Sequence, residues 1–130
     1  MSSKVAPSGE GEESFQPKFD SQGLLTAVAV EIDSGQVLMV AFMNAEAVEA
    51  TRTTRRATFF SRSRNKIWVK GESSGNYLQV EEILVDCDED CLVLKVRLPT
   101  KGVACHTGEK SCFYRKLNLV GPAGLKRIKS

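Results

Sequence analysis

Long hydrophobic runs are missing from this chain, and their absence excludes a helical membrane span. The longest apolar stretches cover residues 24–30 and 37–43, whereas a helix needs about 20 apolar residues to cross a bilayer. Residues 1–18 are polar and hold no apolar stretch of the kind that a secretory signal requires. We therefore expect a cytoplasmic protein with no membrane partner.

A surplus of charge of one sign is also missing. The 18 Lys and Arg residues nearly balance the 16 Asp and Glu residues, which leaves a net charge of +2 in 130 residues. This total does not predict a nucleic acid or another polyanion as partner, so electrostatic arguments have to rest on local clusters. The chain length and the 42% share of hydrophobic residues are typical of one globular domain.

Cysteine and histidine are scarce, because the chain has four Cys and one His. Thiols stay reduced in the cytosol, so disulfides are not expected in a protein without a secretory signal. Clustered thiols in such a protein more often bind metal or carry out chemistry. These few side chains are therefore the first candidates for a functional site.

The pattern of apolar residues predicts a fold that is mainly β (α+β), with one or two short helices. Two apolar runs around a turn at residues 33–35 predict a β-hairpin, and their nearly continuous apolar character predicts strands buried on both faces. Asn44 is a good N-cap for a helix over residues 45–54. Further strands are predicted at 57–62, 66–70, 77–85, 91–98 and 113–117, with a Gly/Ser loop at 71–76. We expect a disordered tail over 1–18, one domain over 19–118 and a C-terminal tail over 119–130.

An acidic cluster separates two of the predicted strands. In an extended chain, Asp86, Asp88 and Asp90 would lie on one side and Cys87 on the other. Three converging carboxylates repel one another unless a hard cation such as Mg²⁺ or Ca²⁺ neutralises them. A thiol that faces away suits a softer metal such as Zn²⁺. The alternative is an acidic turn that water simply solvates.

A second cluster holds Cys105, His106 and Cys112 in a stretch with loop-forming glycines. With Cys87 from the first cluster, Cys105 and Cys112 would give zinc three protein ligands and leave one position open, as catalytic zinc requires. A fourth ligand from Cys91 or His106 would instead close the site and make it structural. His106, beside a candidate ligand, is placed to act as general acid or base. Cys91 begins an apolar strand, so we expect a buried, inert thiol there.

Arginines, hydroxyls and aromatics alternate along residues 59–76, which end in a Gly/Ser loop. Arginine forks and hydroxyls bind phosphate oxygens, loop amides cradle them, and aromatic rings stack on bases. This composition suits a compact nucleotide site. It also suits single-stranded RNA, or a strand face that water solvates.

Several motifs, taken together, identify a family resemblance. They are Ser61-Arg62-Ser63-Arg64, Trp68 followed by Lys70-Gly71-Glu72-Ser73-Ser74-Gly75-Asn76, Asp86-Cys87-Asp88 with Asp90, Ala104-Cys105-His106-Thr107-Gly108, and Ser111-Cys112-Phe113-Tyr114. In this order and at these separations they resemble the phosphoribosyl-AMP cyclohydrolase family. The resemblance runs from about residue 23 to residue 115.

The resemblance implies an enzyme that hydrolyses the N1–C6 bond in the adenine ring of 1-(5-phosphoribosyl)-AMP, a ring opening in L-histidine biosynthesis. It implies that Cys87, Cys105 and Cys112 bind zinc and that Asp86, Asp88 and Asp90 bind magnesium. It also implies an intertwined homodimer with one zinc per subunit, in which each zinc site draws cysteines from both subunits.

The remaining roles follow from the same resemblance and the chemistry of the side chains. His106 would shuttle protons, and Trp68 would stack on a ring of the substrate. Phosphate and other substrate contacts are expected from Ser61, Arg62, Ser63, Arg64, Lys70, Glu72, Ser73 and Ser74. The competing hypothesis is a binding module with a structural zinc that holds single-stranded RNA through Arg62, Arg64 and Trp68.

The chain departs from the family's pattern at two positions in the acidic cluster. Glu89 stands where the family usually has Gly, and Cys91 stands where it often has Ala. Glu89 adds a negative charge beside the presumed cation site and removes a flexible residue.

Overall fold

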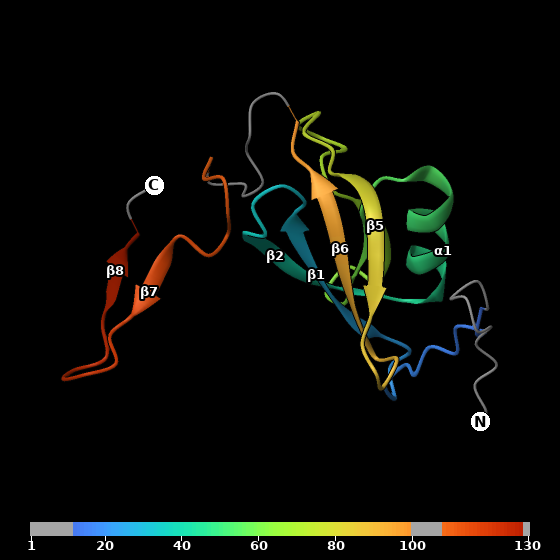
Figure 1. Cartoon of the computed structure of the whole chain (residues 1–130), viewed down its shortest axis with the longest axis horizontal. Helices are drawn as coiled ribbons and strands as arrows, with labels where there is room; N and C mark the ends of the chain where they lie inside the picture. The colour runs from blue at the N-terminus through green and yellow to red at the C-terminus, as the bar shows by residue number, and fades with distance from the viewer. Residues whose placement is uncertain (1–11, 100–107, 129–130) are drawn as a thin grey trace.

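The computed structural model describes residues 12–99 and 108–128. Its main element is a curled six-stranded sheet with the strand order β4-β3-β2-β1-β6-β5 (Figure 1). The strands are β1 (Leu25–Glu31), β2 (Val37–Met43), β3 (Thr58–Ser61), β4 (Lys66–Val69), β5 (Gln79–Val85) and β6 (Cys91–Arg97), and the described residues form one helix, α1 (Ala45–Thr54). The prediction of a mainly β fold in a single small domain is confirmed.

The β1–β2 hairpin is confirmed, but its strands are not buried on both faces. Along β1, burial alternates and Ala27 and Ala29 point into the core. In β2, Val37 and Val40 are 41% and 45% exposed. A sheet packed on one side leaves alternate side chains on its other side in water, so a continuous apolar run did not mean burial on both faces.

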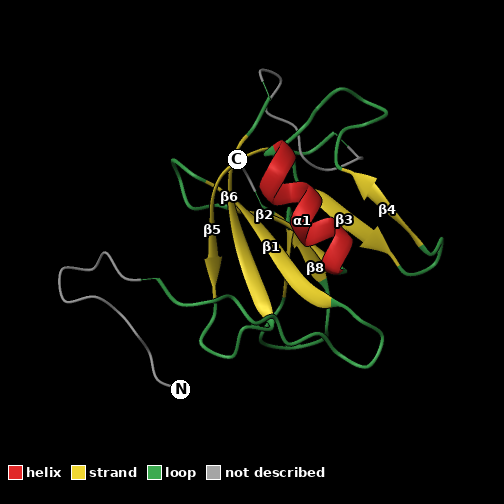
Figure 2. Ribbon diagram, turned by 90° about the vertical axis from the view of Figure 1, so that its right-hand side faces the viewer, coloured by secondary structure: helices red, strands yellow, loops and turns green. Residues whose placement is uncertain are grey.

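Helix α1 forms where the sequence predicts it and covers one face of the sheet (Figure 2). The Asn44 side chain accepts the N–H of Ala47 at 2.8 Å, which caps the first turn. The helix ends at Arg55, whose φ of 65° is left-handed. Its inner face packs beside the core cluster that holds Leu38 and Phe59, both of which are fully buried.

The sheet curls until its two ends nearly meet. The Ala57 N–H donates to the Leu78 carbonyl at 3.1 Å, and the Val80 N–H donates to the Arg55 carbonyl at 2.7 Å. These bonds join the residues before β3 to the start of β5, with Arg56 opposite Gln79. The curl encloses the core, and the loops at the strand ends lie outside it.

A separate hairpin follows, formed by β7 (Arg115–Leu117) and β8 (Leu125–Arg127). Figure 1 shows it projecting away from the six-stranded sheet. Sequence reasoning placed a strand at 113–117 but assigned the rest of this hairpin to a tail. Its Leu117 and Leu125 are 59% and 57% exposed. No helix among the described residues is long and apolar enough to cross a membrane.

Candidate functional site

The acidic cluster forms the loop between β5 and β6, and its three aspartates do converge. Oxygens of Asp86, Asp88 and Asp90 lie within 4.8 Å of one another, and all three residues are exposed. The loop is a turn, not the extended chain that sequence reasoning assumed. The Glu89 N–H donates to the Asp86 carbonyl at 3.0 Å, and Glu89 has a φ of +59°. This turn, rather than strand alternation, brings the carboxylates together.

Asp86 also braces the loop from inside. Its Oδ1 accepts the N–H of Asp90 at 2.9 Å and the N–H of Cys91 at 3.1 Å. Partial removal from water raises the pKa of Asp86, but the hydrogen bonds donated from Asp90, Cys91 and Glu89 lower it more, so it lies below its usual value. Asp86 therefore stays ionised while it holds the turn.

Asp90 behaves in the opposite way. Its hydrogen bond with the Asp86 side chain, its partial loss of water and the negative charges of Asp86 and Asp88 all raise its pKa. Crowding by other carboxylates makes Asp90 harder to ionise than an isolated carboxyl group, and a bound divalent cation would relieve that repulsion. The donor set, all carboxylate oxygen, fits a hard cation such as Mg²⁺.

Cys87 lies on the same loop with an exposed thiol. Cys91, at the start of β6, is partly buried, and burial followed by the charges of Asp86 and Asp90 raises the pKa of its thiol. A raised pKa keeps Cys91 protonated, which agrees with the prediction of an inert thiol, whereas a metal ligand has to be a thiolate. Of the two thiols, that of Cys87 is the more accessible.

Cys112 lies beside the start of β2, while Cys105 and His106 fall outside the described residues. The Cys112 N–H donates to the Leu38 carbonyl at 2.7 Å. Ser111, which is 3% exposed, donates its hydroxyl to the Val37 carbonyl at 2.7 Å and accepts the Phe113 N–H at 2.8 Å. These bonds fix the segment that carries Cys112 to the end of the sheet.

An ion pair reinforces the same attachment. Lys110 Nζ lies 2.8 Å from Oε1 of Glu31, at the end of β1. The hydrogen bond from Lys110, then that from Ser34, lowers the pKa of Glu31. Ser111 belongs to one of the motifs, but the sequence predicts no role for it or for Glu31, because their partners Val37 and Lys110 are distant in sequence.

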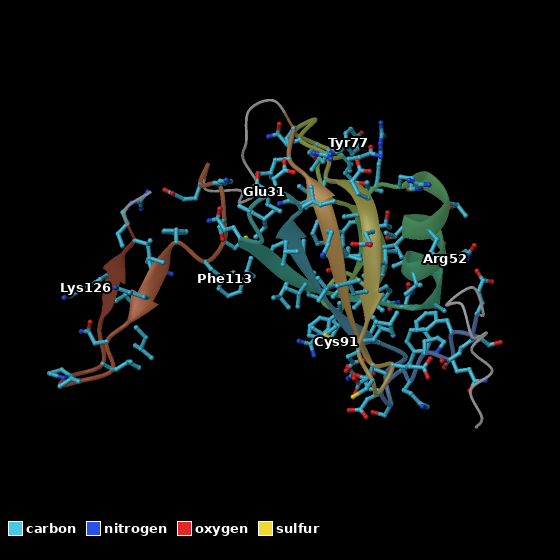
Figure 3. All side chains as sticks on the ribbon, viewed as in Figure 1. Glu31, Arg52, Tyr77, Cys91, Phe113 and Lys126 are labelled. Atoms are coloured by element: carbon cyan, nitrogen blue, oxygen red, sulfur yellow. The ribbon has the colours of Figure 1, made fainter. Side chains whose placement is uncertain are left out.

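Cys87 and Cys112 of one chain lie at opposite ends of the strands. Cys91, next to the acidic loop, pairs with Thr26 at the start of β1, whereas Val37 pairs with Val30 near its end. At about 3.3 Å per residue, these levels are roughly 13 Å apart along β1 alone. In Figure 3, the labelled Cys91 and Phe113 lie in different parts of the molecule.

This separation decides how the two thiols can be used. Zinc–sulfur bonds of about 2.3 Å hold two ligand sulfurs within about 4.6 Å of each other. Cys87 and Cys112 of a single chain are too far apart for one zinc ion. A zinc site that uses both thiols needs two copies of the chain.

Part of the basic, aromatic stretch lines a cavity of about 850 Å³. Its walls are Gln22, Val40, Ala41, Phe42, Phe60, Ser61, Arg62, Ser63, Arg64 and Trp68. The Arg62 guanidinium lies 4.4 Å from the centroid of the Phe42 ring, and Trp68 packs against buried Phe59 with ring centroids 5.2 Å apart. The Ser61 hydroxyl accepts the Arg64 N–H at 3.2 Å. Gln22 and Phe42 were not predicted, since nothing in their local sequence marks them.

A second cavity, of about 360 Å³, includes one residue of the acidic loop in its lining. Phe42 lines both cavities, and Asp90 and Lys18 line the second one. Phe42 therefore separates a cavity lined by arginines and hydroxyls from a cavity lined by one of the converging carboxylates. This arrangement can hold an anionic ligand and a divalent cation side by side.

The remaining predicted contacts, Lys70, Glu72, Ser73 and Ser74, do not line either cavity. Within this loop, Glu72 Oε1 accepts the Val69 N–H at 3.1 Å, and the Ser74 hydroxyl accepts the Asn76 N–H at 3.2 Å. In the single chain these two side chains shape the loop.

Gly71 packs so closely that a larger residue is excluded. It has a φ of +92°, and an added Cβ would lie 2.4 Å from the Asn76 carbonyl carbon and 2.5 Å from the Tyr77 nitrogen. We expect Gly71→Ala to lower the free energy of unfolding by about 3 kcal/mol, from backbone strain and overpacking together. Gly75→Ala is the matched control, because Gly75 has a φ of +83° with open space around it, and should lose only about 1 kcal/mol. Urea unfolding of both variants measures the difference, and equal losses would contradict the role of close packing.

Comparison with known proteins agrees with the motifs. Residues 39–114 match the family model described as phosphoribosyl-AMP cyclohydrolase. A protein of that name from Erythrobacter litoralis is 55% identical over 118 residues, which cover 91% of this chain and 93% of the relative. Proteins of the same name from Rhizorhabdus wittichii and Sphingopyxis alaskensis are 52% and 54% identical, over 88% and 82% of this chain and 90% and 83% of their own lengths.

Proposed function

Because the chain belongs to the phosphoribosyl-AMP cyclohydrolase family, we propose that it opens the adenine ring of 1-(5-phosphoribosyl)-AMP by hydrolysing the N1–C6 bond. The chain is an enzyme of histidine biosynthesis that acts on a nucleotide. The observation that carries the finer proposal is the pair of adjoining cavities, with Arg62 and Arg64 at one end and Asp90 at the other. A substrate with two phosphates needs positive charge at two points along its length. The arginines would supply it at one point, and a cation held beside Asp90 would supply it at the other.

The zinc site is proposed to form between two subunits. Cys87 of one subunit would meet Cys105 and Cys112 of the partner subunit, with one zinc per subunit. The separation of Cys87 and Cys112 along the strands supports this arrangement. Zinc, when bound, lowers the pKa of coordinated water toward 7 and so supplies a nucleophile at neutral pH.

The C-terminal hairpin (β7–β8) supports a homodimer independently of the thiols. It begins three residues after Cys112 and projects from the sheet with Leu117 and Leu125 exposed (Figure 1). It also carries four basic residues, Arg115, Lys116, Lys126 and Arg127. A second subunit would cover its apolar side chains, and its positive charge complements the acidic loop.

The side chains take the following proposed roles. Asp86, Asp88 and Asp90 would hold Mg²⁺, whose positive charge would screen the phosphates, while Ser61, Arg62, Ser63 and Arg64 would bind phosphate oxygens. Trp68 would offer one ring face to the substrate, because its other side packs on Phe59. His106 would carry protons between water and the ring nitrogen that leaves C6. Lys70, Glu72, Ser73 and Ser74 would contact substrate only if the second subunit or substrate brings their loop to the cavity.

The test is the ultraviolet absorbance of phosphoribosyl-AMP incubated with the purified protein. We expect a spectral change that stops when a chelator removes zinc and returns when zinc is added back. No change with folded, zinc-loaded protein would overturn the proposed activity. Salt-sensitive binding of single-stranded RNA, measured in the same preparation, would then support the binding-module hypothesis.

A further inference from the structure

The segment before the sheet is hydrogen-bonded to Glu89 of the acidic loop. We call residues 13–18 the N-terminal strap. The Gln16 N–H donates to Oε1 of Glu89 at 2.8 Å, and the Lys18 N–H donates to the Glu89 carbonyl oxygen at 2.7 Å. Composition had assigned these residues to a disordered tail. Instead, both strap bonds end on Glu89.

Glu89 holds a backbone conformation that favours glycine. Its φ of +59° lies in the left-handed region, where a side chain costs free energy that glycine does not incur. Only a residue with an acceptor side chain can make the bond to Gln16, so this hydrogen bond offsets the strain. The Glu89 carboxylate is thus directed to the strap and is not one of the three that converge at the candidate cation site.

The strap also forms one wall of a cavity beside the predicted metal ligands. This cavity of about 300 Å³ is lined by Glu13, Ser14 and Phe15 from the strap and by Val85, Asp86, Cys87 and Glu89 from β5 and the loop. Asp86 belongs to the cation cluster and Cys87 is the proposed zinc ligand. Displacement of the strap would therefore open the space beside both residues to solvent.

We propose that Glu89 is a positioning residue that clamps the N-terminal strap to the acidic loop and holds the loop ready for metal. The inference rests on one part of the proposed function, namely that the acidic loop binds a cation. The internal bonds of Asp86 fix the loop from β6, and the Glu89 bonds fix it from the strap. A loop held on both sides loses less conformational freedom when metal binds, so its affinity is higher.

Two variants at the same position separate the clamp from its charge. Glu89→Gln removes the charge but keeps an acceptor oxygen and the side chain. Glu89→Gly removes the charge and the acceptor, and it relaxes the backbone. We expect amide exchange at Gln16, followed by NMR, to rise about tenfold or more in Glu89→Gly and to stay near wild type in Glu89→Gln. Affinity for Mn²⁺, followed by electron paramagnetic resonance, should fall about tenfold further in Glu89→Gly than in Glu89→Gln.

Each outcome bears on the proposal. Faster Gln16 exchange together with weaker Mn²⁺ binding, in Glu89→Gly alone, supports it. Unchanged Gln16 exchange, or faster exchange with equal Mn²⁺ affinity in both variants, overturns it while leaving the proposed function intact. Failure of the wild type to bind Mn²⁺ would overturn both the cation site and this inference, and ultraviolet turnover of the wild type tests the reaction separately.

Discussion

Cys87→Ala and Cys112→Ala are each expected to abolish turnover alone, and an equal mixture of the two should recover about a quarter of wild-type activity. The reason is geometric, because the two thiols lie at opposite ends of the strands in one chain. In a mixed dimer, one zinc site combines both altered positions and the other combines both intact ones. Random pairing makes half of the dimers mixed, and half of their sites are intact.

The mixture is measured after co-refolding, with native mass spectrometry to count mixed dimers and the ultraviolet assay to follow turnover. Cys112→Ala mixed with the double variant Cys87→Ala, Cys112→Ala is the control, since no pairing of those chains restores a site. Cys91→Ala should keep its activity, because that thiol is partly buried and stays protonated. Mixed dimers that form without any recovery would show that the site is not shared.

Local sequence signals were enough to predict most of the sheet and the helix. Asn44 caps a helix through its own side chain, and such a signal is complete within a few residues. The strand β8 was missed because Leu125–Arg127 lies in a basic stretch with Gly and Pro, where no apolar alternation marks a strand. The acidic turn was predicted only as the alternative to an extended segment. A left-handed Glu89 is stabilised by Gln16, 73 residues away, and no local pattern contains that contact.

In the candidate site, too, some features could be predicted from local sequence and others depend on tertiary contacts. The convergence of the three aspartates and the position of Arg62 among hydroxyl and aromatic groups could be predicted from the motifs. Residues that act through tertiary packing could not, because Phe42 joins two cavities and Ser111 bonds to Val37 across the fold. The separation of Cys87 from Cys112 depends on strand register, which composition and spacing do not give.

Asp88→Asn should reduce the affinity of the folded protein for Mn²⁺ or Mg²⁺ by about tenfold or more. Asp88 is the informative position, because its carboxylate makes no hydrogen bond or ion pair with other described residues, whereas Asp86 holds the turn together. An amide at position 88 therefore removes a charged ligand and does not change the conformation of the loop. The negative charge of Asp88 is also one cause of the raised pKa of Asp90, so this pKa should fall in the variant.

Two measurements check this expectation together. Titration with Mn²⁺ gives the affinity, and NMR titration of the Asp90 carboxyl carbon gives the direction of its pKa. Glu82→Gln is the matched control, because it removes one exposed carboxylate from β5 outside the acidic loop and should change neither value beyond weak long-range screening. Unchanged Mn²⁺ affinity in Asp88→Asn would remove Asp88 from the cation site. A lower Asp90 pKa with normal affinity would show that Asp88 affects Asp90 through its charge alone and is not a metal ligand.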